Sequence, residues 1–183
     1  MVVNADLVDD PFFEVLARLP ECLCDELTKA GGPTLCYCGL WVGTDMPPLG
    51  YMDCEGGKPC GAAWVRLDSS FPSTQFPVPD IDTGPVAATC AAPLAYQVEI
   101  GVARCAPRPK GRDLFPDAQA MFEAQRLYMS DLRAMKQAVL CCFPREVQKD
   151  LGKKIAVALG TYVPLPNMSG ISGGTWSAFL AVA

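Results

Sequence analysis

The sequence predicts an α+β protein in which a mixed or antiparallel sheet packs against one long helix, with a further helix near the N-terminus. Residues 94–103 alternate strictly between apolar and mixed side chains, which is the period of a β-strand. Residues 116–142 carry a broad apolar stripe at helical spacing. Shorter alternating runs flank both segments. No period of about 20 to 50 residues repeats, which argues against a solenoid.

The first helix is expected to start at Asp10–Pro11, with an aspartate as the cap and a proline at the first helical position. Pro20 lies inside this helix, so we expect a kink or a break into two short helices. Cys22 and Cys24 should point to opposite sides of it. The diglycine at 31–32 should end it. Its apolar side chains are Phe12, Val15, Leu16, Leu19, Leu23 and Leu27.

Three strands are expected before the long helix. Residues 35–42 form a short one, 62–71 a better one and 94–103 the clearest, with one apolar and one mixed face. That pattern is typical of an antiparallel sheet covered on one side. The connections at 43–61 and 72–93 are rich in glycine or proline. A loop as long as 72–93 is usually functional or lies over a partner surface.

The long helix should start at Pro116–Asp117 and run to about Cys142, with Pro144 just past its end. Its methionines are typical of a helix core, or of a face packed on a neighbouring subunit. Two more strands, 159–165 and 175–182, follow on either side of a turn-rich stretch. The apolar stripe comprises Ala118, Met121, Phe122, Tyr128, Met129, Leu132, Met135 and Val139, and the last strand directs Trp176, Ala178, Leu180 and Val182 to one face.

The chain contains ten cysteines and no histidine. Without histidine it lacks the usual general base and the commonest metal ligand. No cluster of carboxylates has metal-ligand spacing, and no glycine-rich stretch has the spacing of a phosphate loop. We therefore predict no catalytic residues, no cofactor and no enzymatic activity.

The cysteines have four interpretations. Disulfides within a one-residue pair are disfavoured, because Cα atoms two residues apart on a strand are roughly 6.6 Å apart with parallel side chains. Any disulfides should therefore link different segments. A redox-active thiol would lack both the C-x-x-C spacing and a histidine partner. Buried free thiols acting as small hydrophobic groups are the main rival to disulfides. The candidates for disulfides are Cys22, Cys24, Cys36, Cys38, Cys54, Cys60, Cys90, Cys105, Cys141 and Cys142.

The fourth interpretation is a structural zinc site. Cys36, Cys38, Cys54 and Cys60 supply the right number of ligands, but the C-x-x-C knuckle spacing is absent.

The length and net charge of the chain limit which classes of protein it can belong to. A chain of 183 residues is most simply one domain. The net charge of −5 argues against tight, nonspecific binding to nucleic acid, yet suits a surface past which DNA slides. No segment reaches the roughly 18 to 20 apolar residues of a membrane span. Residues 1–10 contain three acidic and no basic side chains, unlike a secretory signal. We expect a chain made in a reducing cytoplasm.

Several short strings resemble the cysteine-rich neck or tail-terminator proteins of phages of actinobacteria, and the order of elements is similar to the lambda-like tail-terminator family. These strings are Leu35-Cys36-Tyr37-Cys38, Gly61-Ala62-Ala63-Trp64-Val65-Arg66-Leu67, Pro93-Leu94-Ala95-Tyr96-Gln97-Val98-Glu99-Ile100-Gly101-Val102, Arg104-Cys105-Ala106-Pro107, Cys141-Cys142, Leu159-Gly160-Thr161-Tyr162-Val163-Pro164-Leu165 and Gly173-Gly174-Thr175-Trp176.

The resemblance implies a non-enzymatic virion protein, assembled in the host cytoplasm, that forms a hexameric ring at the head–tail junction. Such a ring ends the tail tube, contacts the major tail protein on one side and a stopper or connector protein on the other, and lets genomic DNA pass through its lumen without specific binding. It implies no cofactor and no membrane. Residues 1–183 would form a single tail-terminator-like domain, with Cys/Pro-rich insertions near 33–61 and 72–93 that depart from the lambda-like pattern.

Two alternatives stay open. The first is a head-to-tail stopper or adaptor protein of the same neck. The second, from another class, is a small zinc-stabilised binding protein. A chain built in a reducing cell and released in a particle to an oxidising exterior would account for the many cysteines.

Overall fold

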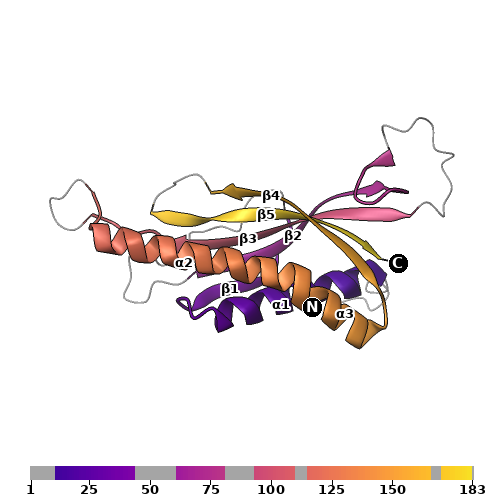
Figure 1. The fold of residues 1–183 in the computed structure, drawn as a ribbon, viewed down its shortest axis with the longest axis horizontal. Helices are drawn as coiled ribbons and strands as arrows, with labels where there is room; N and C mark the ends of the chain where they lie inside the picture. The colour runs from indigo at the N-terminus through magenta and orange to yellow at the C-terminus, as the bar shows by residue number, and fades with distance from the viewer. Residues whose placement is uncertain (1–10, 44–60, 81–92, 110–114, 166–169, 183) are drawn as a thin grey trace, which may run out of the picture.

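The structure, a computed structural model, describes residues 11–43, 61–80, 93–109, 115–165 and 170–182. It is an α+β fold, as the sequence predicted, with the helices on one side of a five-stranded sheet (Figure 1). In chain order the elements are α1 (Pro11–Lys29), β1 (Leu35–Leu40), β2 (Gly61–Pro72), β3 (Leu94–Cys105), α2 (Ala118–Gln137), the π-helix η4 (Ala138–Cys142), α3 (Phe143–Leu151), β4 (Ile155–Pro164) and β5 (Ile171–Val182).

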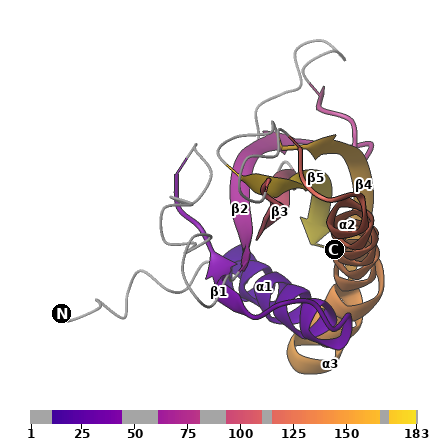
Figure 2. The ribbon, with the colours of Figure 1, turned by 90° about the vertical axis from the view of Figure 1, so that its left-hand side faces the viewer.

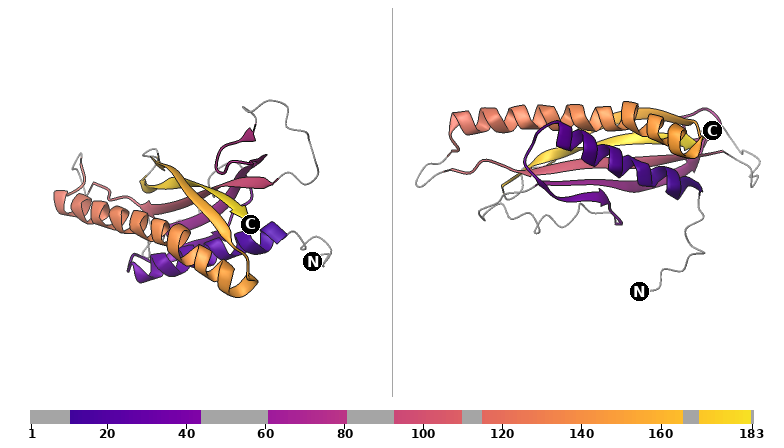
Figure 3. Two further views of the ribbon diagram at one scale, coloured as in Figure 1. Left: turned by 45° about the vertical axis from the view of Figure 1, so that its right-hand side comes forward. Right: turned by 90° about the horizontal axis from the view of Figure 1, so that it is seen from below.

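The strands lie in the order β1-β2-β3-β5-β4, so β1 and β4 form the two edges. β1 pairs with β2 in parallel, and every other pair is antiparallel, which makes the sheet mixed. β3 is the central strand and is paired along its length with β2 and β5. Figure 2 shows the sheet curving, with α1 and α2 along it. Viewed from below in Figure 3, α1 and the α2–α3 helix lie side by side across the sheet.

The main core lies between this helical layer and one face of the sheet. The alternation predicted for β3 is confirmed, because Val98, Ile100 and Val102 all face the helices and are buried. Apolar side chains of α1 and of the long helix pack against them, and the predicted face of β5 lies beside them in the sheet. The largest buried members are Leu19, Leu23, Leu27, Met135, Phe143 and Leu180.

α1 corrects one prediction and confirms another. It is one continuous helix through Pro20, so of the two predicted outcomes, a kink or a break into two short helices, the break is wrong. The proline removes one backbone hydrogen bond, but the apolar face of α1 is buried on both sides of it, and this packing holds the helix together. Gly31 ends the helix with a φ of 75°, a left-handed conformation that glycine adopts without steric cost. The predicted cap, Asp10, lies outside the described residues.

The long helix does not end at Cys142 as predicted. It continues through η4 into α3 and ends at Leu151, with Gly152 as a left-handed cap. Pro144 is tolerated because the π-turn comes directly before it and places it in the first turn of α3, where a proline costs no hydrogen bond. The π-turn keeps Val139, Phe143 and Val147 on the buried face.

The predicted stripe on this helix is only partly core. Met135 and Val139 are buried, but Met121, Phe122 and Met129 are exposed. The first turns of α2 lie at one end of the molecule, at the left of Figure 1. The helical period of the sequence could not distinguish apolar side chains that pack into the core from apolar side chains on the same stripe that remain exposed.

The other face of the sheet is not simply open to solvent. Trp64 is fully buried there in a small second cluster with Ala62 and Ala103. Gly101, its neighbour across the β2–β3 pair, leaves room for the indole, because a β-carbon there would collide with the ring. The predicted one-sided sheet is therefore wrong at this end.

Candidate functional site

Two disulfides join segments that are distant in the sequence, as expected for cysteines that cannot bridge within their own pairs. Cys22 of α1 is bonded to Cys142 at the end of η4, across a sequence separation of 120. Cys24 is bonded to Cys38 of β1, across a separation of 14. The two α1 cysteines therefore reach different elements, because residues two apart on a helix point to different sides.

The remaining cysteines separate into three groups. Cys36 and Cys105 are also disulfide-bonded. Cys141 is a free, exposed thiol. Cys54, Cys60 and Cys90 lie outside the described residues.

The disulfide bonds of the structure argue against the predicted zinc site. Cys36 and Cys38 are both in disulfides, so neither can act as a thiolate ligand in this state. The other two members of the predicted site, Cys54 and Cys60, lie outside the described residues. Among the residues that are described, no group of three or more histidine, cysteine, aspartate or glutamate side chains could hold a metal ion.

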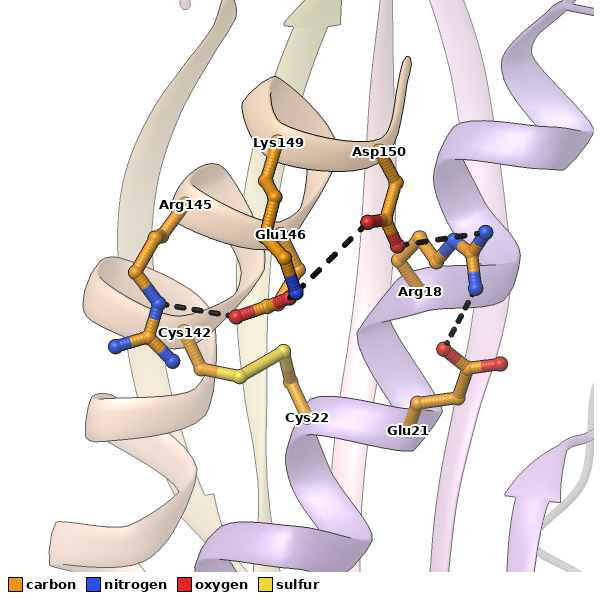
Figure 4. A network of polar contacts seen from close by, with 8 residues as sticks. All are labelled: Arg18, Glu21, Cys22, Cys142, Arg145, Glu146, Lys149 and Asp150. Carbon is orange, nitrogen blue, oxygen red and sulfur yellow. Dashed lines mark hydrogen bonds and ion pairs between the residues drawn. A yellow bond between two sulfur atoms is a disulfide. The ribbon is translucent and has the colours of Figure 1, made fainter. Parts of the chain in front are cut away.

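A polar network lies beside the Cys22–Cys142 disulfide where α1 and α3 meet (Figure 4). Arg18 of α1 connects the two helices, with one guanidinium nitrogen 3.5 Å from an Asp150 oxygen of α3. Both cysteines and these charged side chains line a crevice of about 190 Å³. The disulfide itself is buried, and exposed ion pairs of this kind add little stability. The bond therefore fastens α1 to the long helix.

Glu146 lies at the centre of the α3 part of this network. Lys149 donates to one of its carboxylate oxygens at 3.1 Å, and Arg145 donates to the other at 3.0 Å. These two hydrogen bonds lower the pKa of the Glu146 carboxyl. The arrangement neutralises charge on the helix surface.

A buried ion pair connects β3 to α2. Arg104 donates from Nε and Nη2 to the two carboxylate oxygens of Asp131, at 3.0 and 2.9 Å. It also donates to the Pro33 carbonyl before β1. No side-chain nitrogen or oxygen that is buried in the described part of the chain lacks a hydrogen-bond partner. The pair is fully bonded, so it orders the end of the core and does not act as a reactive group.

A groove borders this ion pair between the first half of α2 and residues 106–109, which follow β3. Its inner part has a volume of about 460 Å³ and its outer part about 910 Å³. We call it the α2 groove. The outer part is lined chiefly by apolar side chains, and among the described residues Arg108 is the one charged residue that borders it. The outer lining includes Pro107, Phe115, Met121, Tyr128, Leu165 and Ile171.

Two tyrosines form the wall between the groove and the sheet. The rings of Tyr128 on α2 and Tyr162 on β4 meet edge to face, with centroids 5.8 Å apart. Burial, followed by the hydrogen bond with Tyr128, raises the pKa of the Tyr162 hydroxyl well above its usual range. Tyr162 is thus a neutral structural group at neutral pH.

The α2 apolar surface, defined as Phe115, Met121, Phe122 and Met129, extends outward from the groove. Phe115 is 79 % exposed and Phe122 is 67 % exposed. Large apolar side chains grouped on one surface are typical of an interaction site. Within the described residues, no helix is long and apolar enough to cross a membrane.

A second polar cluster lies on the opposite face of the sheet. Arg66 donates to both oxygens of Glu99, at 2.9 and 3.1 Å, and the Trp64 indole nitrogen donates to Glu99 at 3.2 Å. This cluster closes over the small second core. Arg66 also donates to the Gly43 carbonyl at 3.3 Å, so it connects this cluster to the end of the β1 segment.

Sequence reasoning missed the Arg104–Asp131 pair and the α2 groove. Two signals pointed to the pair: Arg104 continues the core-facing alternation of β3, and Asp131 lies within the apolar stripe of α2. A charged residue at each of two core positions indicates a mutual partner. The groove has no local signal, because four separate segments build it.

Comparison with known proteins gives no relative on which to base a function. No protein family and no curated protein matches this sequence.

Proposed function

We propose that this chain is a structural protein of a long-tailed bacteriophage, forming a ring at the head–tail junction that ends the tail tube and joins it to the head connector. The α2 apolar surface carries the proposal. Phe115 and Phe122 are large aromatic side chains that are mostly exposed among the described residues, and contact with another subunit or a partner protein would bury them.

The disulfides also support the proposal of a virion protein. A phage protein is made in a reducing cell and then released in particles to an oxidising exterior. Bonds such as Cys22–Cys142, which join elements of one chain that are already packed together, can form after folding and fasten the folded subunit.

Four of the strings that resemble neck proteins contribute residues to the lining of the α2 groove: 93–102 through Val102, 104–107 through Arg104 and Pro107, 159–165 through Tyr162 and Leu165, and 173–176 through Gly173. The other three lie on β1, β2 and η4. The net charge of −5 suits a lumen through which DNA passes without specific binding.

Mass photometry of the purified protein, alone and with isolated tail tubes, tests the proposal. We expect a particle of about six times the 19.6-kDa chain mass. Only monomer, even with tail tubes present, would contradict it. Antibody labelling of virions separates a terminator from a stopper or adaptor, because the two occupy different layers of the neck.

Metal analysis of the same protein tests the zinc-stabilised alternative. About one zinc per chain would favour that class over a disulfide-fastened virion protein.

A further inference from the structure

Burial and backbone pairing attach β1 only weakly to the rest of the fold. β1 is an edge strand of six residues, and none of the six is fully buried. It pairs with β2 in parallel, and the pairing shifts register between Leu35 and Tyr37. Parallel pairs are slightly less stable per residue than antiparallel pairs, and a register shift interrupts the ladder of hydrogen bonds.

Disulfide bonds add to this weak attachment. Two of the six residues of β1, Cys36 and Cys38, are disulfide-bonded. The partner of Cys38 is Cys24 of α1, and Figure 2 shows β1 beside this helix at the edge of the sheet. α1 is itself firmly packed, because its whole apolar face is buried in the main core. The Cys24–Cys38 bond therefore joins a weakly held strand to a well-anchored helix.

β4, the opposite edge of the sheet, is attached in a different way. It also has no fully buried residue and a register shift in its pairing, but it contains no cysteine. Its ten residues pair with β5 in the antiparallel direction, which gives it a longer and more stable ladder than β1 has. β4 is therefore an internal reference for an edge strand that is held without a disulfide.

The two α1 disulfides differ in their access to a reductant. Cys22 and Cys142 are only 2 % and 5 % exposed. The crevice beside them is lined by four carboxylates and three cationic side chains, so its charge does not attract an anionic thiolate. Cys24 and Cys38 are half-buried. Because reduction starts with the attack of a thiolate on an accessible sulfur, the Cys24–Cys38 bond should open before the Cys22–Cys142 bond.

We propose that the Cys24–Cys38 bond is a redox switch for β1. The strand stays on the sheet while the bond is intact, and it opens locally when a dithiol reduces the bond, while α1 and the central strands stay packed. The switch is a property of the folded chain, and it does not depend on the proposed function.

The reduction has two steps. One thiolate of the dithiol attacks a sulfur of the Cys24–Cys38 bond, which forms a mixed disulfide and releases one cysteine thiolate. The second sulfur of the dithiol then displaces the other cysteine and closes the oxidised dithiol into a ring. The protein gains two electrons, and the two protons of the dithiol pass to the two cysteines.

Amide hydrogen exchange of the full chain, read by mass spectrometry, tests the switch. The samples are the oxidised protein, the same protein treated with dithiothreitol under native conditions, and the variant Cys24→Ser/Cys38→Ser, which keeps the disulfide of Cys36. The amides of residues 35–40 should exchange at least about tenfold faster in the treated protein and in the variant than in the oxidised protein. The amides of β3 and β4 should exchange at unchanged rates.

Two further measurements accompany the exchange. Iodoacetamide added during the dithiothreitol treatment should modify Cys24 and Cys38 before Cys22 and Cys142. Cys141→Ser is the matched control, because it removes a free, exposed thiol that belongs to no disulfide, and its β1 amides should exchange as in the wild type. Circular dichroism checks that both variants are folded, and the treated wild-type protein tests the switch independently of either variant.

Every other result overturns the switch. Equal β1 exchange in the oxidised, treated and variant proteins would show that pairing alone holds the strand. Fast β1 exchange in the treated protein but not in the variant would assign the attachment to the disulfide of Cys36. Acceleration of β1 and β3 together would mean that reduction unfolds the whole chain, and earlier modification of Cys22 and Cys142 would reverse the order of access. A chain that stays monomeric in mass photometry contradicts the proposed function and leaves the switch as it is.

Discussion

Arg104 of β3 and Asp131 of α2 form a two-point ion pair inside the protein, with side chains only 6 % and 7 % exposed. The pair joins the central strand to the long helix at the inner end of the α2 groove. Its removal should therefore affect stability and the shape of the groove together.

Replacing Asp131 alone should be strongly destabilising. Asp131→Ala leaves the Arg104 guanidinium buried without its counter-charge, and we expect a loss of about 3–5 kcal/mol in the free energy of unfolding. Urea unfolding followed by tryptophan fluorescence measures this. The double variant Arg104→Met/Asp131→Leu removes both charges and should lose much less. An equal loss in the two variants would show that packing, not the unpaired charge, is the cause.

The Cys22–Cys142 and Cys24–Cys38 disulfides should contribute unequally to stability. In the chain-entropy account, a bond that closes a longer loop constrains the unfolded chain more, with about 3 kcal/mol for a 15-residue loop and about 4.7 kcal/mol for a 100-residue loop. Cys22→Ala/Cys142→Ala, which opens a separation of 120, should therefore destabilise more than Cys24→Ala/Cys38→Ala, which opens a separation of 14. Denaturation under non-reducing conditions gives both values. The reverse order would show that native-state effects outweigh loop entropy.

Chemical labelling should distinguish the adjacent cysteines of η4. Cys141 is exposed and free, whereas Cys142 is bonded to Cys22. Iodoacetamide added to the native, unreduced protein should therefore modify Cys141 and leave Cys142 linked. Tandem mass spectrometry of the digested protein reads both sites. A Cys142 that is alkylated before reduction would contradict the pairing.

Gly101 should tolerate no side chain. A β-carbon there collides with the buried Trp64 indole, so Gly101→Ala should cost about 1–3 kcal/mol and change the tryptophan emission spectrum. Gly39→Ala is the matched control on β1, because the nearest atom to its new β-carbon, the Tyr37 hydroxyl oxygen, lies at an ordinary 3.5 Å. Equal effects of the two substitutions would exclude the collision as the cause.

Tyr162 should make the fold sensitive to alkaline pH. Its pKa is raised in the folded chain, chiefly by burial, so folding favours the neutral hydroxyl. This contribution is fully present below the unfolded-state pKa of about 10, and it is lost as pH rises above that value. Absorbance at 295 nm should show Tyr162 ionising only with unfolding. Tyr162→Phe should reduce the fall in stability between about pH 9 and 11, and an unchanged fall would assign it to other groups.

Some features of the fold follow from local sequence patterns, and others follow from tertiary packing. The β3 alternation, the face of β5 and the end of α1 at Gly31 were all predicted correctly, because strand period, helix period and glycine conformation are local properties. The end of the long helix was not. Pro144 is a strong local stop signal, and only packing on both sides of the π-turn explains why the helix continues to Leu151.

By itself the sequence predicted an α+β chain with a central alternating strand, a long amphipathic helix and cysteines for which a bridge within a one-residue pair is disfavoured. Only the tertiary structure decided which cysteines meet, that Arg104 finds Asp131, and that half of the apolar stripe of α2 faces outward. The physical reason is the same in each case. Local patterns fix the direction of a side chain from its own backbone, but its partner depends on distances between segments that only the packed fold brings together.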